Sequence, residues 1–528
     1  MKKGTIFLTA ILLVLSLTDL KGETADTLSV RPGGQVFEML PFISPWLGTS
    51  NPASISESFP GNMNRFYAGF MKKHDDLRAV QQPETTTSYK VITEGYKQIG
   101  RLTFFGSFGY ENAFYDGVLY NGTMKYNTIN PYIVGDTVPK VQSKEEFTIS
   151  GKLNYNLTDK LTLALGADYS SAVGAKQKDP RNKDNILFFK VTPGIIWKLG
   201  KLDLGFHLSG FTSSDEVSYS VVGNIGTYNI FIMRGLGYFL EEPDIDSYSE
   251  WYKGQGYGAG LQASFKSGNI VNIAEVTLDF SKEEVRSGGS YQLLDGIANT
   301  TTIAFSDQFK IYNNGILHLI SLNGSLSSLS GDDIIQKSLP VTVETPTYKY
   351  TYYQIKTLNW TKNKQLISDY SFNAGYKYLL PDQHNNVNTE FGADMTLKYF
   401  YSGHYPLSNN GYLNSLNLTC RAFFKKGFLS GKVRITPGAE AEYRMNLSSD
   451  ISYTPMESNI PELVSKDFDI LNTSYIKGEI SSRVDLPTTW KFIKSIFVDP
   501  SFSYAKAVNS KRGSLSNMFI HASAGVTF

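Results

Sequence analysis

His207 and Ser209 are the residues whose types and spacing come nearest to nucleophilic catalysis in this sequence. Residues two apart on a strand point to the same side, so the histidine imidazole could activate the serine hydroxyl for acyl transfer. Such chemistry also needs a group that orients the histidine and donors that stabilise an oxyanion. Neither can be assembled from the residues around this pair, and we therefore predict that the protein is not an enzyme.

The sequence offers no clear set of residues for a metal or cofactor site. The other histidines are scattered and Cys420 is the single cysteine, so they build neither a metal site nor a disulfide. An acidic cluster lies in the longest predicted loop, at Glu241, Glu242, Asp244, Asp246 and Glu250. Its spacing is not that of a calcium loop, and a solvated acidic loop is the simpler account, with a divalent-cation site as the alternative. We predict no metal and no cofactor.

Charged and apolar residues alternate from Phe428 to Asn446, which predicts one strand with a luminal side and a lipid-facing side. The luminal side carries Lys432, Arg434, Glu440, Glu442 and Arg444. Five charges of mixed sign need water or partner charges around them. We expect a network of ion pairs that stiffens a barrel wall, and a rail that selects a substrate is the alternative.

Four glycines at alternate positions share one side of another predicted strand, Gly254, Gly256, Gly258 and Gly260. A phosphate-binding loop would lead into a helix, whereas here the alternation of a strand continues. Glycine weakens a strand, so a row of glycines indicates close approach by another backbone or a bend. Either an inner plug presses on this wall, or the glycines kink the wall to shape a barrel.

The strands that position these residues are best seen at the chain end, from Ser516 to Phe528. Its residues alternate between an apolar side and a mostly polar side that includes His521, over about the length of a tilted membrane crossing. The stretch resembles the terminal assembly signal of bacterial outer-membrane barrels, with His521 at the polar place and Val526 and Phe528 at the apolar places. Ser523 stands where that signal usually has glycine. A barrel pairs such a last strand with its first.

Similar alternation recurs along the chain from Asn64, for example between Leu161 and Tyr169. Tight turns alternate with long connections, which is typical of barrels with short periplasmic turns and long extracellular loops. We expect the long connections to include residues 171–185, 284–299 and 327–365. The count gives roughly sixteen strands, or roughly eighteen if Asn64 to Ile99 supplies two.

The composition agrees with a large all-β membrane protein. Aromatic residues make up 13% of the chain and charged residues 19%, which suits a barrel with aromatic girdles. The 50 basic and 49 acidic side chains leave a net charge of +1, without the basic excess that a nucleic-acid partner requires. We therefore predict no nucleic-acid partner.

Three parts are expected along the chain. Residues 1–22 read as a signal peptide, with Lys2 and Lys3 before an apolar core that is too short to stay in the membrane. Residues 23–62 are expected to form a periplasmic or plug segment, and residues 63–528 the barrel. The first part contains no cysteine after its core, so no lipid anchor is expected.

The tetrapeptide Asn51-Pro52-Ala53-Ser54 resembles an element near the start of fatty-acid-transporter-type barrels. In those barrels the amino-terminal segment forms a plug inside the lumen, so the resemblance implies that Asn51 and Pro52 contact the wall, and we assign the glycine row as their partner. An ordinary Asn-Pro turn is the alternative.

As a whole, the chain resembles outer-membrane barrel families of unknown function from Bacteroidota. The resemblance implies an integral protein of the cell outer membrane that contacts lipid, lipopolysaccharide and the barrel-assembly machinery. We predict an all-β transmembrane antiparallel barrel of sixteen to eighteen strands with an amino-terminal luminal plug. Its expected function is passive transport of a small, hydrophobic or other solute; the alternative is a non-conducting barrel that docks beside another outer-membrane transporter or surface complex.

Overall fold

The structure is a computed structural model that describes residues 35–57, 61–126, 129–223, 228–288, 292–345, 348–382, 386–405, 411–454, 460–490 and 492–528. The predicted signal peptide, residues 1–22, lies outside the described residues. In the part that the structure describes, no helix has both the length and the apolar character to cross a membrane.

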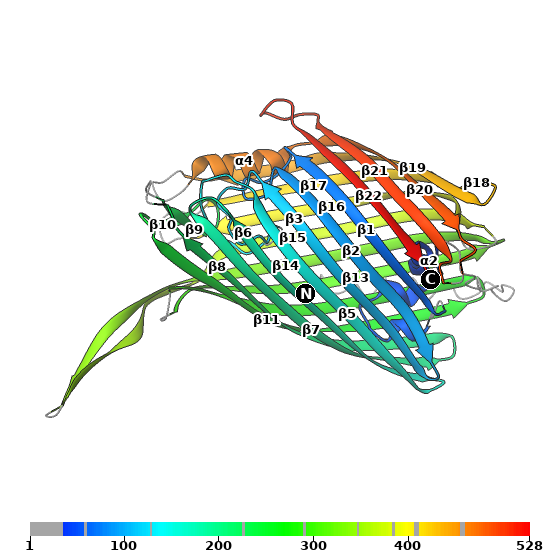
Figure 1. The fold of residues 1–528 in the computed structure, drawn as a ribbon, viewed down its shortest axis with the longest axis horizontal. Coiled ribbons are helices and arrows are strands. Elements are labelled where there is room, and N and C mark those ends of the chain that lie inside the picture. The colour runs from blue at the N-terminus through cyan, green and yellow to red at the C-terminus, as the bar shows by residue number, and fades with distance from the viewer. Residues whose placement is uncertain are drawn as a thin grey trace, which may run out of the picture.

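Eighteen antiparallel strands close into a barrel (Figure 1). A nineteenth member of the sheet, β18 (Phe428–Ser430), is a three-residue strand that pairs only with β19. In chain order the barrel strands are β1 (Met63–Asp75), β2 (Thr85–Ile99), β3 (Leu102–Asp116), β5 (Gln142–Thr158), β6 (Leu161–Lys176), β7 (Arg181–Leu199), β8 (Leu202–Ser220), β11 (Ser247–Ser267), β12 (Ile270–Ser287), β13 (Leu293–Asn313), β14 (Ile316–Glu344), β15 (Lys349–Pro381), β16 (Val387–His404), β17 (Gly411–Lys426), β19 (Val433–Ser452), β20 (Tyr475–Pro487), β21 (Ser495–Ala507) and β22 (Ser516–Thr527). The fold prediction is confirmed at its upper count, because Asn64 to Ile99 supplies most of β1 and all of β2.

The last strand closes the barrel onto the first. β22 pairs with β21 on one side and with β1 on the other, in a register that runs from Arg65 opposite Thr527 to Asp75 opposite Asn517. The backbone N–H of Phe528 donates to the carbonyl of Asn64 at 2.9 Å. Closure leaves neither terminal strand with an open edge, as the alternation at the chain end predicts.

The exposure of the strands is inverted relative to that of a soluble protein. On β6, Leu163 and Leu165 are 40% and 49% exposed, whereas Thr162, the residue before Leu163, is 1% exposed. Alternate side chains of a strand point to opposite faces, so the apolar set faces outward and the polar set faces the lumen. That is the arrangement of a barrel with lipid outside.

Three connections that we expected as loops are largely strand. β6 and β7 extend through most of residues 171–185, β12 and β13 through most of 284–299, and β14 and β15 form a long hairpin over 327–365. The hairpin projects away from one end of the barrel (Figure 1). The sequence analysis treated the loss of apolar alternation as the end of a strand, but strand pairing continues beyond the lipid because it rests on backbone hydrogen bonds.

Two sets of elements fold at the two ends of the lumen (Figure 1). Residues 35–57, here called the plug, contain α2 (Val36–Ile43), η1 (Pro45–Gly48) and α3 (Ser54–Glu57) at the end with the short turns and the carboxyl terminus. The other end holds a three-stranded sheet of β4 (Tyr132–Gly135), β9 (Ile230–Arg234) and β10 (Phe239–Glu242), together with α4 (Pro461–Asn472). We call this second set the cap.

Candidate functional site

The plug begins with a fully bonded glutamine. The Gln35 side-chain amide donates to Thr436 Oγ1 at 3.0 Å and to Asp485 Oδ2 at 2.9 Å, and its carbonyl accepts from the Val387 N–H at 2.9 Å. Three wall strands, β16, β19 and β20, therefore hold one side chain. Glu38 of α2 adds an ion pair with Arg483 at 2.8 Å, which ties the first helix to the same wall.

Asn51 is the second anchor of the plug, and it is fully buried. Its Nδ2 donates to the carbonyls of Ile195 at 3.1 Å and Phe206 at 3.3 Å and to Gln262 Oε1 at 3.0 Å. Its Oδ1 accepts from the Ala53 N–H at 3.0 Å, so the tetrapeptide is a side-chain-bonded turn that also lies against the wall. Both interpretations of Asn51-Pro52-Ala53-Ser54, turn and plug, describe this segment.

His207 belongs to the same buried network. Gln262 Nε2 lies 2.8 Å from His207 Nδ1 and donates to Glu275 Oε1 at 2.7 Å, and Glu275 accepts from the Ser50 N–H at 3.0 Å. Ser209 lies on the same luminal side of β8, beside Gly258. The histidine therefore takes part in holding the plug.

The plug lies against glycines, but these are not the predicted ones. A Cβ at Gly194 would stand 2.9 Å from Pro52 Cδ, one at Gly205 would stand 3.0 Å from Trp46 Cζ3, and one at Gly166 would stand 3.3 Å from Pro52 Cβ. Glycine at these places lets the plug backbone and rings approach the wall.

The predicted contact of Asn51 and Pro52 with the glycine row of β11 is wrong. The nearest atoms to a Cβ at Gly254, Gly256, Gly258 and Gly260 belong to side chains of the neighbouring strands β8 and β12. These are Ser213, Phe211, Asp279 and His207, so the row makes room for luminal side chains of the wall itself. Composition along one strand could not show which side chains of adjacent strands would fill that space.

The cap closes the other end through apolar packing. Tyr132, Val134 and Ile232 of its sheet pack into a core with luminal residues of β8 and β11 to β15. The opposite side of the sheet, through Ile133 and Met233, packs on Leu463 of α4. Such a core holds the cap in place through apolar contacts, at roughly 25 cal/mol for each Å² of apolar surface that it buries.

Polar contacts fix the position of the cap in the mouth of the barrel. The Val134 N–H donates to Tyr252 Oη at 2.9 Å, and buried Lys176 and Asp136 form an ion pair at 2.6 Å. Arg444 Nη2 donates to the Leu471 carbonyl of α4 at 3.0 Å. The cap is thus tied to the wall at several separate points.

Four of the five residues of the predicted charged wall lie on the luminal side of β19. Arg434 is at the plug end and pairs with Asp382, Glu440 lies farther along the strand, and Arg444 reaches the cap. Glu442 accepts from Tyr475 Oη at 2.8 Å. Lys432 is a correction: it follows Gly431, with φ of +63°, in the exposed turn between β18 and β19 and is not luminal. The alternation continues across this turn, so the sequence pattern concealed it.

Charged side chains of neighbouring strands form ion pairs with Glu440 of β19 and with one another on the luminal wall, and we call this set the ladder. Arg421 pairs with Asp394 at 2.6 Å and with Glu440 at 3.6 Å, and Lys477 reaches Glu440 at 3.7 Å and Glu479 at 3.2 Å. The pairs run sideways over β16, β17, β19 and β20, which agrees with the prediction of an ion-pair network. Asp394, Arg421, Lys477 and Glu479 were not among the predicted site residues, because register alone brings them to Glu440.

The ladder faces space inside the barrel. The side chain of Arg421 is 41% exposed and that of Lys477 is 27% exposed, although both point to the lumen. Inward side chains at the plug and the cap are buried by comparison, as Gln35 and Tyr252 are. The wall between the two closures is therefore polar, charged and accessible to water.

The predicted assembly residues lie as their alternation requires. His521 is luminal and opposite Met71 of β1, and Val526 is opposite Phe66 on the lipid side. Their role as an assembly signal stays a prediction. Within the described ranges, no group of three His, Cys, Asp or Glu side chains is arranged to hold a metal ion.

Comparison with solved structures finds proteins described as transporters and receptors. The outer membrane transporter YddB of Escherichia coli gives a TM-score of 0.38 at 8% identity, over 87% of this chain and 80% of that chain. The ferric preacinetobactin receptor BauA of Acinetobacter baumannii gives 0.37 at 7% identity, over 88% and 80%. The copper transporter OprC gives 0.37 at 8% identity, over 89% and 81%.

No curated protein matches the sequence. The resemblance to fatty-acid transporters and to Bacteroidota barrels stays a prediction, whereas the expected placement in a barrel family of unknown function is confirmed. Residues 52–528 match the family of unknown function DUF6850, and the chain belongs to that family.

Proposed function

We propose that this protein resides in the outer membrane and carries a small polar solute across it by passive transport. The observation that carries the proposal is the accessible charged ladder of Asp394, Arg421, Glu440, Lys477 and Glu479 between two non-covalent closures. A wall of eighteen strands encloses more space than its own side chains fill, and large barrels use such space as an aqueous path.

The chemistry of the ladder favours a polar solute over the hydrophobic one that the sequence left open. Alternating signs along four strands offer donors and acceptors to a zwitterionic or hydroxyl-rich molecule without a strong preference for one charge. The closed ends imply that the path opens when the plug and the cap move, since each is held by hydrogen bonds, ion pairs and apolar contacts alone.

Proteoliposome uptake tests the proposal. A variant that lacks residues 35–57 and carries Ile232→Asp, which places an unpaired charge in the cap core, disables both closures. We expect uptake of small zwitterions and sugars by this variant and little uptake by the wild type. In the same background, Arg421→Gln should shift the preference toward cations, and Lys349→Gln on the projecting hairpin should not. A doubly disabled, folded barrel that admits no solute would refute transport.

A docking role is the second candidate, and one feature favours it. The hairpin of β14 and β15 carries Tyr348, Tyr350 and Tyr352 at 61%, 46% and 45% exposure, with neighbouring ring centroids 5.8 and 6.2 Å apart. Exposed tyrosines are enriched at protein interfaces. If removal of residues 335–361 abolishes co-purification of a membrane partner while solute uptake stays absent in every variant, the docking role replaces transport.

A further inference from the structure

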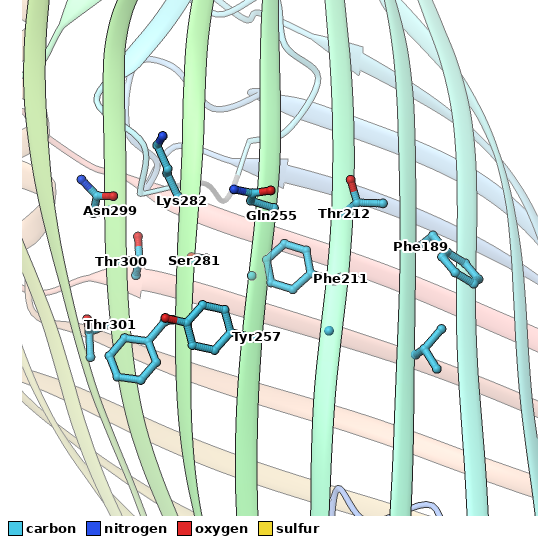
Figure 2. Close-up of a pocket in the computed structure, with 14 residues that line it drawn as sticks. Phe189, Phe211, Thr212, Gln255, Tyr257, Ser281, Lys282, Asn299, Thr300 and Thr301 are labelled. Atoms are coloured by element: carbon cyan, nitrogen blue, oxygen red, sulfur yellow. The ribbon is translucent and has the colours of Figure 1, made fainter.

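We propose that the outer face of the barrel holds a specific site for a lipid with a phosphate headgroup. The site is a hollow of about 790 Å³ across β7, β8, β11, β12 and β13, shown in Figure 2. Its volume is within the range of small-molecule sites. The proposal concerns the lipid-facing side and is independent of the luminal path.

The hollow exists because one outward position has no side chain. Gly210 of β8 lies between Val191 of β7 and Tyr257 of β11 in the strand register. A Cβ there would meet only the Gly256 carbonyl oxygen, at 4.0 Å, so the space in front of Gly210 is open. Phe189, Tyr257 and Phe280 rise around it as aromatic walls, and Tyr257 is 69% exposed.

The strand register divides the outward residues at and beside the hollow into apolar rows and a polar row. One row places Gly210, Tyr257 and Phe280 side by side, and the row nearer the barrel centre holds Leu208, Ala259 and Leu278. The next row toward the cap end holds Thr212, Gln255, Lys282 and Asn299. The change from apolar to polar outward residues marks the boundary between acyl chains and headgroups, where barrels carry an aromatic girdle.

The polar row is made of hydrogen-bond donors suited to an anion. Lys282 is its cation, the amides of Gln255 and Asn299 and the hydroxyl of Thr212 donate as well, and the described lining contains no carboxylate. Figure 2 shows these polar side chains on one side of the hollow and Tyr257 on the other. Farther toward the cap end, Lys253 and Arg286 lie beside Glu284 and Glu216. Counted together with Lys282, these side chains carry one more positive than negative charge.

One neighbouring carboxylate holds the cations at the rim of the hollow. Glu284 accepts from Lys282 Nζ at 2.7 Å through one oxygen and from Arg286 Nη2 at 2.7 Å through the other. The lysine head is therefore positioned before a ligand arrives, which lowers the entropic cost of binding. A bound lipid would therefore place its acyl chains on the apolar row at Gly210 and its phosphate against the polar row at Lys282.

Two variants test the site without touching the lumen. Gly210→Leu fills the floor, and the open space there means that the barrel tolerates the side chain; Lys282→Gln removes the cation. Gly151→Leu is the matched control, because a Cβ at this glycine of β5 also meets nothing within 4 Å. Heat-modifiable migration on a gel verifies that each variant is folded.

The probes are dioleoylphosphatidylglycerol, lipid A, dioleoylglycerol and inorganic phosphate, each added to the delipidated full-length protein and counted by native mass spectrometry. We expect the two phosphate lipids to bind one to one and at least tenfold more tightly than dioleoylglycerol, and both Gly210→Leu and Lys282→Gln to weaken them at least tenfold. Tighter binding of lipid A than of phosphatidylglycerol identifies lipopolysaccharide as the source. The proposal would be overturned if the wild type and all variants bound the phosphate lipids equally. It would also be overturned if inorganic phosphate by itself displaced these lipids from the protein.

Discussion

At the scale of single residues, the plug depends on close contacts that only small or well-bonded side chains allow. Asn51 uses both ends of its amide, and Gly194 and Gly205 leave the space into which the plug fits. A buried amide with every partner satisfied specifies one position, because moving it leaves its partners unpaired at about 1–3 kcal/mol each. These residues therefore determine where the plug lies on the wall more than how tightly it is held.

Gly194→Ala should loosen the plug. The new Cβ stands within 3.0 Å of Pro52, and overpacking of this kind costs about 1–3 kcal/mol. We expect hydrogen exchange in residues 35–57 to be roughly tenfold faster, as about 1.4 kcal/mol implies. Gly106→Ala is the control, because a Cβ at Gly106 meets nothing within 4 Å. Equal exchange in the two variants would mean that the plug does not rest on this contact.

Asp467 of α4 makes the cap sensitive to pH. Burial raises the pKa of its carboxyl from 3.8 to about 6, against the opposing effects of the Val80 N–H that it accepts at 2.8 Å and of Arg512 and Arg78. Because the docked pKa is the higher one, protonation favours docking. The contribution is fully present below about pH 4 and is lost as the pH rises through about 6.

Protection factors of residues 461–472 measure this dependence. We expect them to rise as the pH falls from 7 to 4 in the wild type. Asp467→Asn keeps an acceptor for Val80 without the charge, so its protection should stay near the acid value throughout. A parallel pH dependence in the two proteins would assign the effect to other groups.

At the scale of elements, β22 decides whether the sheet closes. It contributes an entire ladder to β1 and another to β21, and its outward side meets lipid. The edge that it covers would otherwise stay open on β1. The same strand is where a change of two residues should have the largest effect on assembly.

Replacing Val526 and Phe528 by Asp should prevent closure and leave the chain in the periplasm for degradation. A charge facing lipid costs a few kcal/mol when deep and less near the interface. Immunoblots of outer-membrane fractions measure the loss, with Ser501→Asp on the luminal side of β21 as the control that adds a charge away from lipid. Wild-type levels of the double variant in the outer membrane would show that closure does not depend on this apolar side.

Much of the element scale could be predicted from the sequence, because a period of two along a strand is a local property. The faces of β8, β19 and β22 followed from it, as did closure by the last strand. The partners of those faces are not local: Arg421 meets Glu440, and Gln262 meets Asn51, through register and folding back of the plug. For the same reason the glycine row was assigned to the wrong contact, and Lys432 was placed on a wall that ends at a turn.

At the scale of the whole molecule, the barrel has a polar luminal wall with the plug at one end and the cap at the other. β19 connects the two, from Thr436, which accepts from the plug, to Arg444, which donates to the cap. The wall between them carries the charged ladder. The proposed transport requires both closures to move before solute passes, because one of them lies at each end of the lumen.

Planar-bilayer conductance of four proteins tests this account most directly: the wild type, the deletion of residues 35–57, Ile232→Asp, and the two changes combined. The account predicts that the wild type and both single variants are silent, and that the combined variant shows a stable ohmic conductance. Its conductance should respond to Arg421→Gln by a shift in cation preference, since that residue faces the path. A combined variant that is folded and as silent as the wild type would contradict the central claim.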